Sequence, residues 1–184
     1  MRKQIAFLTL SVLTLATLAS AQQDKSKRPS PPAQAQCKFA DGKTIKTDYS
    51  SPRMHDPKTH AMRKIYGGLV PYGEVWRTGA NDATTFVTDT NLTVGGKDVP
   101  AGSYTIFTVP AADKWTLIIS KKTGEWGIPY PGGGDDLARV DMKVSQPPAP
   151  VENFTIAFDQ AGGTCTMRLD WESTRASVEV AEGK

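Results

Sequence analysis

The chain has 184 residues and a formal net charge of +3, a length that suits one ordinary domain and is short for two. Residues 1–35 hold five basic residues and one acidic residue, so the rest of the chain is close to neutral. Nucleic acids and membrane surfaces bind clustered positive charge, which this sequence lacks, so neither is expected as a partner.

Residues 1–21 have the organisation of a secretory signal peptide. Arg2 and Lys3 precede an apolar run that ends near Leu18, and an A-x-A cleavage site follows at residues 19–21. A bilayer crossing needs about 20 apolar residues, and this run is shorter and interrupted by Ser and Thr, which argues against an uncleaved anchor. We expect cleavage after Ala21, a periplasmic or secreted protein, and no stable membrane insertion afterwards.

Residues 22–36 contain three prolines and no large apolar side chain. Such a segment cannot bury enough surface to offset its ordering entropy, so the sequence predicts a disordered spacer here. A single domain is expected over residues 37–181, followed by a short tail at 182–184.

Cys37 and Cys165 lie near opposite ends of the predicted domain. In an oxidising compartment this placement favours a disulfide between the first strand and a late one. Two unpaired buried thiols are the alternative, because a sequence cannot show that the two sites come within bonding distance.

Short alternating segments separated by glycine-rich turns follow the spacer. Asp41-Gly42 and Gly95-Gly96 suit the positive φ angles of type I′ hairpin turns. Late in the chain, apolar residues alternate with polar ones in two segments, from Phe154 to Phe158 and from Cys165 to Trp171. This period of two predicts strands with one buried face, the face on which Cys165 also lies.

Helical apolar spacing is missing from the predicted domain, where about nine or ten short strands can be identified. We therefore predict an all-β fold, an antiparallel β-sandwich of immunoglobulin-like or prealbumin-like type. A barrel is the alternative.

Residues 50–82 interrupt the rhythm of short strands. A connection this long is uncommon in a compact domain unless it is functional or disordered, and its aromatic content argues against disorder. Tyr66, Tyr72 and Trp76 accompany several glycines, so we expect tight turns that press the rings against the sheet.

Several motifs resemble the bacterial secreted family known as domain of unknown function 2911. The most specific is the run Lys64-Ile-Tyr-Gly-Gly-Leu-Val-Pro-Tyr-Gly-Glu-Val-Trp-Arg-Thr-Gly-Ala-Asn81, and further matches are Pro100–Phe107, Gly124–Gly127 and Leu169–Glu172. The resemblance covers about residues 37–181 and implies a bacterial exported protein, without a mechanism. The sequence departs from the family pattern at Asp82, where Glu is usual, and in the insert from His55 to His60.

The candidate ligand-binding residues combine aromatic rings with an arginine, an amide and a carboxylate: Tyr72, Trp76, Arg77, Asn81, Asp82 and Trp126, with Tyr130 as a further candidate. Secreted modules use such groups to hold a sugar or small polar ligand, because rings stack and planar polar groups form hydrogen bonds. In the structural alternative, Trp76 plugs the end of the fold while Arg77 pairs with Asp82 or caps carbonyl groups.

Two functional hypotheses follow. The favoured one is a non-enzymatic exported domain that binds a small polar or carbohydrate ligand, an envelope component or a partner protein. The other is an envelope-acting hydrolase or lyase that uses Arg77, Asn81 and Asp82. No catalytic residue, cofactor or metal site is assigned, because no nucleophile with its base is evident and His55 and His60 make a poor metal signature.

Overall fold

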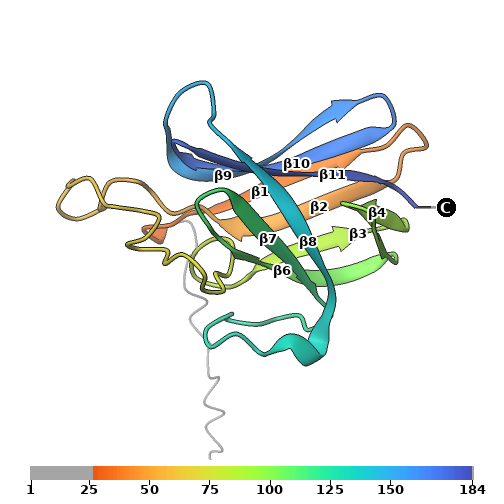
Figure 1. The fold of residues 1–184 in the computed structure, drawn as a ribbon, viewed down its shortest axis with the longest axis horizontal. Helices are drawn as coiled ribbons and strands as arrows, with labels where there is room; N and C mark the ends of the chain where they lie inside the picture. The colour runs from red at the N-terminus through yellow and green to blue at the C-terminus, as the bar shows by residue number, and fades with distance from the viewer. Residues whose placement is uncertain (1–26, 184) are drawn as a thin grey trace, which may run out of the picture.

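The computed structural model describes residues 27–183, which form an all-β domain (Figure 1). The predicted signal peptide lies outside the described residues. The strands are, in chain order, β1 (Pro32–Lys38), β2 (Thr44–Ser50), β3 (Thr84–Thr88), β4 (Leu92–Val94), β5 (Lys97–Val99), β6 (Gly102–Val109), β7 (Lys114–Ser120), β8 (Asp136–Ser145), β9 (Val151–Ala161), β10 (Thr164–Glu172) and β11 (Thr174–Glu182), with the short 3₁₀ helix η2 (Gly133–Asp135) before β8. Across residues 27–183, no helix has the length and apolar character needed to span a membrane.

The strands belong to one antiparallel sheet with the neighbour order β1-β2-β3-β6-β7-β8-β11-β10-β9. The β4–β5 hairpin joins this sheet through β4, which pairs with β11. The sheet curls so that its end strands β1 and β9 come together (Figure 1). The all-β antiparallel prediction is confirmed, and the curling gives the nearly closed barrel that was the alternative arrangement.

The chain just beyond β2 pairs with the start of β9 and so closes part of the seam between the two edges of the sheet. The amide of Phe154 donates to the Pro52 carbonyl at 2.8 Å, and the amide of Met54 donates to the Glu152 carbonyl at 2.7 Å. The buried hydroxyl of Ser51 adds a bond to the Phe154 carbonyl at 2.7 Å. The long segment that starts here is therefore fixed to the sheet by backbone pairing.

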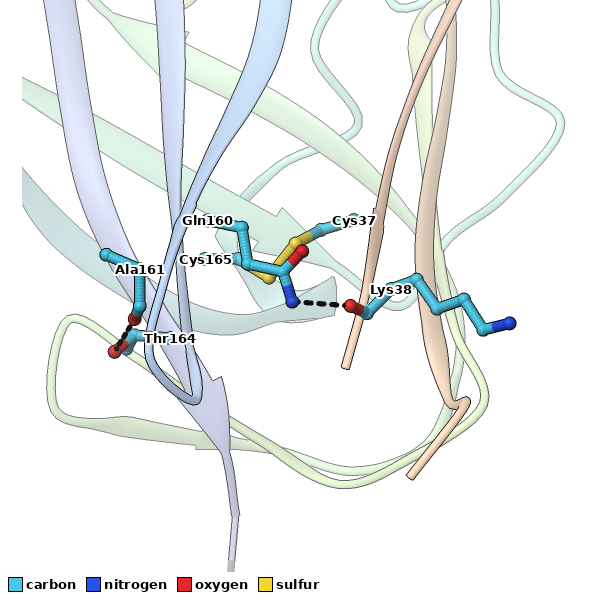
Figure 2. The surroundings of a disulfide bond; sticks show 6 residues. All are labelled: Cys37, Lys38, Gln160, Ala161, Thr164 and Cys165. Atoms are coloured by element: carbon cyan, nitrogen blue, oxygen red, sulfur yellow. Dashed lines mark hydrogen bonds between the residues drawn. A yellow bond between two sulfur atoms is a disulfide. The ribbon is translucent and has the colours of Figure 1, made fainter. Parts of the chain in front are cut away.

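A disulfide between Cys37 and Cys165 closes the seam further along, with Cα atoms 6.4 Å apart. Figure 2 shows it linking β1 to β10, with the Gln160 side chain beside it donating to the Lys38 carbonyl at 2.7 Å. The predicted disulfide is confirmed, and the alternative of two unpaired thiols is wrong.

The predicted alternation is confirmed by the buried core. Phe154 and Ile156 on β9 point inward, as do Cys165, Met167 and Leu169 on β10. At one end of the core, Trp115 and Trp171 are fully buried. These two indoles form the floor on which the long segment packs.

The ordered domain begins before the predicted boundary. Residues 32–36, predicted as part of a disordered spacer, form most of β1, and Pro32 pairs with Ser50. Ala33 and Ala35 pack against the core, while backbone hydrogen bonds to β2 hold the strand. The prediction failed because small side chains gave no apolar signal, although the ladder itself needs none. At the other end, β11 includes Glu182, so the tail is also shorter.

The two predicted hairpin turns differ. Gly95 and Gly96 have φ angles of 50° and 82°, as a type I′ turn requires. At the β1–β2 hairpin, the Gly42 amide instead donates to the Phe39 carbonyl, and Gly42 has a positive φ while Asp41 does not. This is a three-residue connection with a glycine bulge, in which the Asp41 carboxylate also accepts from the Lys43 amide.

Candidate functional site

Trp76 anchors the long segment to the aromatic end of the core. Its backbone amide and carbonyl both bond to Thr108 on β6, at 2.7 and 2.9 Å. Its ring stacks on Trp171 at 6.0 Å between centroids and meets Phe154 edge-on at 4.9 Å. The indole N–H donates to the Gly79 carbonyl at 2.9 Å. These contacts fix the orientation of Trp76.

Tyr66 and Tyr72 complete the packing of the segment at a neighbouring position. Tyr66 is buried with its ring edge-on to Trp115 at 5.1 Å, and burial raises the pKa of its phenol. Tyr72 stacks on Tyr66 at 6.4 Å and is half exposed. Both tyrosines therefore serve the fold of the segment, and Tyr72 is not among the described residues that surround the pocket below.

Tight turns with left-handed backbone carry the residues after Trp76. Thr78 and Asn81 both have φ of 57° although neither is glycine. The Thr84 hydroxyl donates to the Thr78 carbonyl at 2.7 Å, and the Asn81 amide donates to the Ser30 carbonyl at 3.0 Å. Side-chain hydrogen bonds thus hold the strained positions in place.

Arg77 projects from this turn and is only partly buried. One terminal nitrogen donates to the carbonyls of Asn81 and of Trp126, the latter at 3.0 Å. The guanidinium carbon lies 5.0 Å from the centre of the Trp126 ring, within reach of a cation–π interaction. Burial lowers the pKa of Arg77, and the nearby Asp82 opposes that effect. Arg77 therefore caps carbonyl groups, as the structural alternative expected, but makes no ion pair with Asp82.

A pocket of about 450 Å³ opens beside Trp76 and Arg77, within the size range of small-molecule sites. Its lining comes from the segment before β1, from two stretches of the long segment (residues 52–63 and 69–81), from the loop that follows Trp126, and from the core. The lining residues are Pro29, Ser30, Pro52, Arg53, Asp56, Pro57, Lys58, Arg63, Leu69, Val70, Trp76, Arg77, Gly79, Ala80, Asn81, Ile128 and Trp171. An indole, a guanidinium and an amide thus share one cavity with several cations.

The predicted site residues divide between this pocket and its surroundings. Trp76, Arg77 and Asn81 line the cavity, and Trp126 covers Arg77 from outside with its ring 53% exposed. Asp82 lies instead on a neighbouring hollow, where it pairs with Arg28 at 3.5 Å.

Tyr130 lies elsewhere. It packs edge-on against Phe107 and donates its hydroxyl to Asp136, which also binds Arg139. Asp136 is therefore held in a local polar network.

Three cationic residues of the pocket were not predicted as site residues, namely Arg53, Lys58 and Arg63. They lie in and beside the insert from His55 to His60, to which no function was assigned. The one signal in the sequence is the number of cations in this short polar stretch. Surface loops often carry such charges, so this signal does not distinguish a binding site from a solvated loop.

The two histidines of this insert do not meet. His55 contacts Glu152 through Nδ1 at 2.7 Å, while His60 is exposed. Across residues 27–183, no three His, Cys, Asp or Glu side chains gather in a way that could hold a metal ion.

The family described as "Protein of unknown function (DUF2911)" matches the chain over residues 30–180. The chain belongs to this family. The match begins close to β1 and ends within β11, so it covers all but the end of the last strand. No curated protein and no solved structure gives a significant match.

Proposed function

We propose that the domain is an exported, non-catalytic module that binds a small polar ligand, such as a carbohydrate, in the pocket beside Trp76. The observation that carries the proposal is the shared wall formed by the Trp76 indole, the Arg77 guanidinium and the Asn81 amide. An aromatic surface next to fixed hydrogen-bonding groups is the usual composition of a small-molecule site. Export rests on the features of residues 1–21.

Preorganisation supports this role for Trp76. Its ring is fixed by Trp171 and Phe154, and its N–H is used internally, so the indole offers a rigid apolar surface. A rigid surface binds at a lower entropic cost than a mobile one, because no side-chain freedom remains to be lost.

The hydrolase alternative receives less support from the same geometry. Asp56 is the one carboxylate among the described lining residues. It accepts hydrogen bonds from the amides of Lys58 and Thr59, which lower its pKa and favour the charged form. A carboxyl group held in this way is a poor proton donor, and it has no facing carboxylate in the pocket.

Calorimetric titration of the mature protein with a panel of mono- and disaccharides tests the proposal, with Arg77→Ala as the decisive variant. We expect Arg77→Ala to remain folded, with an unfolding transition close to that of the wild type, and to bind at least about tenfold more weakly. The control is Lys114→Ala, which removes the same charge from an exposed pair with Asp141 outside the pocket.

Two results would count against a binding role for Arg77. Loss of folding in Arg77→Ala would favour a purely structural role, in which the guanidinium holds the Asn81 and Trp126 carbonyls. A folded Arg77→Ala that binds the saccharide with the affinity of the wild type would show that the guanidinium does not contribute to binding.

A further inference from the structure

The pocket carries a strong excess of positive charge. Four of its described lining residues are cationic, namely Arg53, Lys58, Arg63 and Arg77, against the single acid Asp56. Lys58 lies within a loop closed by pairing of His55 with Met62, and Arg53 and Arg63 lie on either side of this pair. They share the cavity with Arg77, although the domain as a whole is nearly neutral. The concentration is therefore a local property of this cavity.

The arginines of the pocket are also unlike the other arginines of the domain. Four arginines outside the pocket each form an ion pair with an aspartate, namely Arg28, Arg139, Arg168 and Arg175. Arg175, for example, lies 2.7 Å from Asp170. Within residues 27–183, none of the pocket arginines has a carboxylate oxygen within 4.0 Å. Among residues 27–183, the arginines outside the pocket are therefore ion-paired, and those of the pocket are not.

The hydrogen bonds of the pocket arginines use only some of their donors. Arg63 donates one terminal nitrogen to the Arg53 carbonyl, while its buried Nε has no hydrogen-bond partner among the described residues. Arg77 uses a single terminal nitrogen for both of its carbonyl contacts. Each pocket arginine does have an acid in its vicinity. Arg63 acts on Asp56, Arg53 acts on Glu152 and Asp82 acts on Arg77 through space, but these interactions are not ion pairs.

We infer that the ligand of this pocket is an acidic saccharide, whose ring lies on the Trp76 wall and whose anionic group is bound by Arg53, Arg63 and Arg77. The inference rests on the proposed binding function and adds the chemical class. Guanidinium groups match the two oxygens of a carboxylate or phosphate. Arg63 and Arg77 are partly buried and Arg53 is exposed, so the first two gain most from such a partner. Leu69 and Ile128, which are 50% and 58% exposed, supply an apolar rim beside the ring.

Titration calorimetry with three matched sugars tests whether an anionic group on the ligand strengthens binding. Glucuronic acid, its neutral methyl ester and glucose share one ring and differ in the anionic group, while glucose 6-phosphate tells a phosphate from a carboxylate. We expect glucuronate or glucose 6-phosphate to bind at least about tenfold more tightly than both neutral sugars, with an affinity that falls as salt is raised.

Variants assign the effect to the pocket. Arg63→Gln and Arg53→Gln should each remove most of the preference for the acidic sugar over glucose. The matched control is Arg139→Gln, which removes an arginine that is paired with Asp136 away from the pocket. It should retain the preference.

The outcomes separate the two proposals. Equal affinity for the acidic and neutral sugars would overturn the charge assignment and leave the binding function standing. Binding of inorganic phosphate without any saccharide would overturn the saccharide class. No binding by any of the sugars, with Kd above about 10 mM for each, would overturn the proposed function and this inference with it.

Discussion

Removal of the disulfide should cost the domain a large part of its stability. Cys37 and Cys165 are 128 residues apart, so the bond closes a loop that spans nearly the whole domain. In the chain-entropy model a loop of this length restricts the unfolded chain by about 5 kcal/mol. Since real disulfides often deliver less than this, we expect the double variant Cys37→Ala/Cys165→Ala to lose ~3 to 5 kcal/mol.

Urea unfolding followed by tryptophan fluorescence measures this loss, because Trp115 and Trp171 are buried in the core. With a urea dependence of about 2 kcal/mol per molar, the midpoint should fall by about 2 M. The double variant avoids the free thiol that a single substitution would leave.

Gln160→Ala is the matched control for the same seam. It removes the bond from Gln160 to the Lys38 carbonyl without opening the covalent loop, and this exposed bond should be worth about 1 kcal/mol or less. If the double cysteine variant loses no more than Gln160→Ala, the entropic reasoning is refuted, and the backbone pairing of residues 52–54 with 152–154 is sufficient to close the sheet.

Two further predictions concern a turn and a phenol. Gly95→Ala would place a Cβ atom 2.1 Å from Val140 at a φ of +50°, and should lower the free energy of unfolding by ~2 to 4 kcal/mol. Gly96→Ala is the control, since Gly96 has a φ of +82° with nothing within 4 Å of the added Cβ, and it should cost only about 1 kcal/mol. Equal melting temperatures for the two variants would contradict the predicted clash with Val140. Burial and Asp136 raise the pKa of Tyr130 to about 12, so the folded state holds the phenolic proton more tightly than the unfolded state, whose pKa is about 10. The contribution of this phenol to the free energy of unfolding is complete below pH 10 and is lost as the pH rises towards 12. Tyr130→Phe should therefore show a smaller decline in the free energy of urea unfolding over this pH range. An equal decline in the variant and the wild type would contradict the prediction.

The sequence by itself predicted most of the strands and favoured the disulfide. Alternation from Phe154 to Phe158 and from Cys165 to Trp171 reports which side chains face the core, because successive residues of a strand point to opposite sides. The same phase placed Cys165 on the inward face. Gly95-Gly96 marked one hairpin turn, because few other residues tolerate positive φ at two consecutive positions. Asp41-Gly42 marked the other hairpin, although only Gly42 has a positive φ there. These signals are local, and so they can be read without knowing the partners.

The tertiary structure alone decided what surrounds Trp76. The sequence predicted that Trp76 and Arg77 lie in a packed segment. Because the ligand-binding and the structural interpretation both predict such packing, the sequence could not distinguish between them. Arg53 and Arg63 reach the same cavity only because backbone pairing fixes residues 52–54 to the start of β9, and Asp82 points to Arg28 and away from the pocket. The start of β1 could not be predicted from the sequence either, because backbone hydrogen bonds to β2 hold that strand and its small side chains give no apolar pattern. Pairing between distant segments sets which charges meet and which stay unpaired, and a linear pattern of residues carries no record of it.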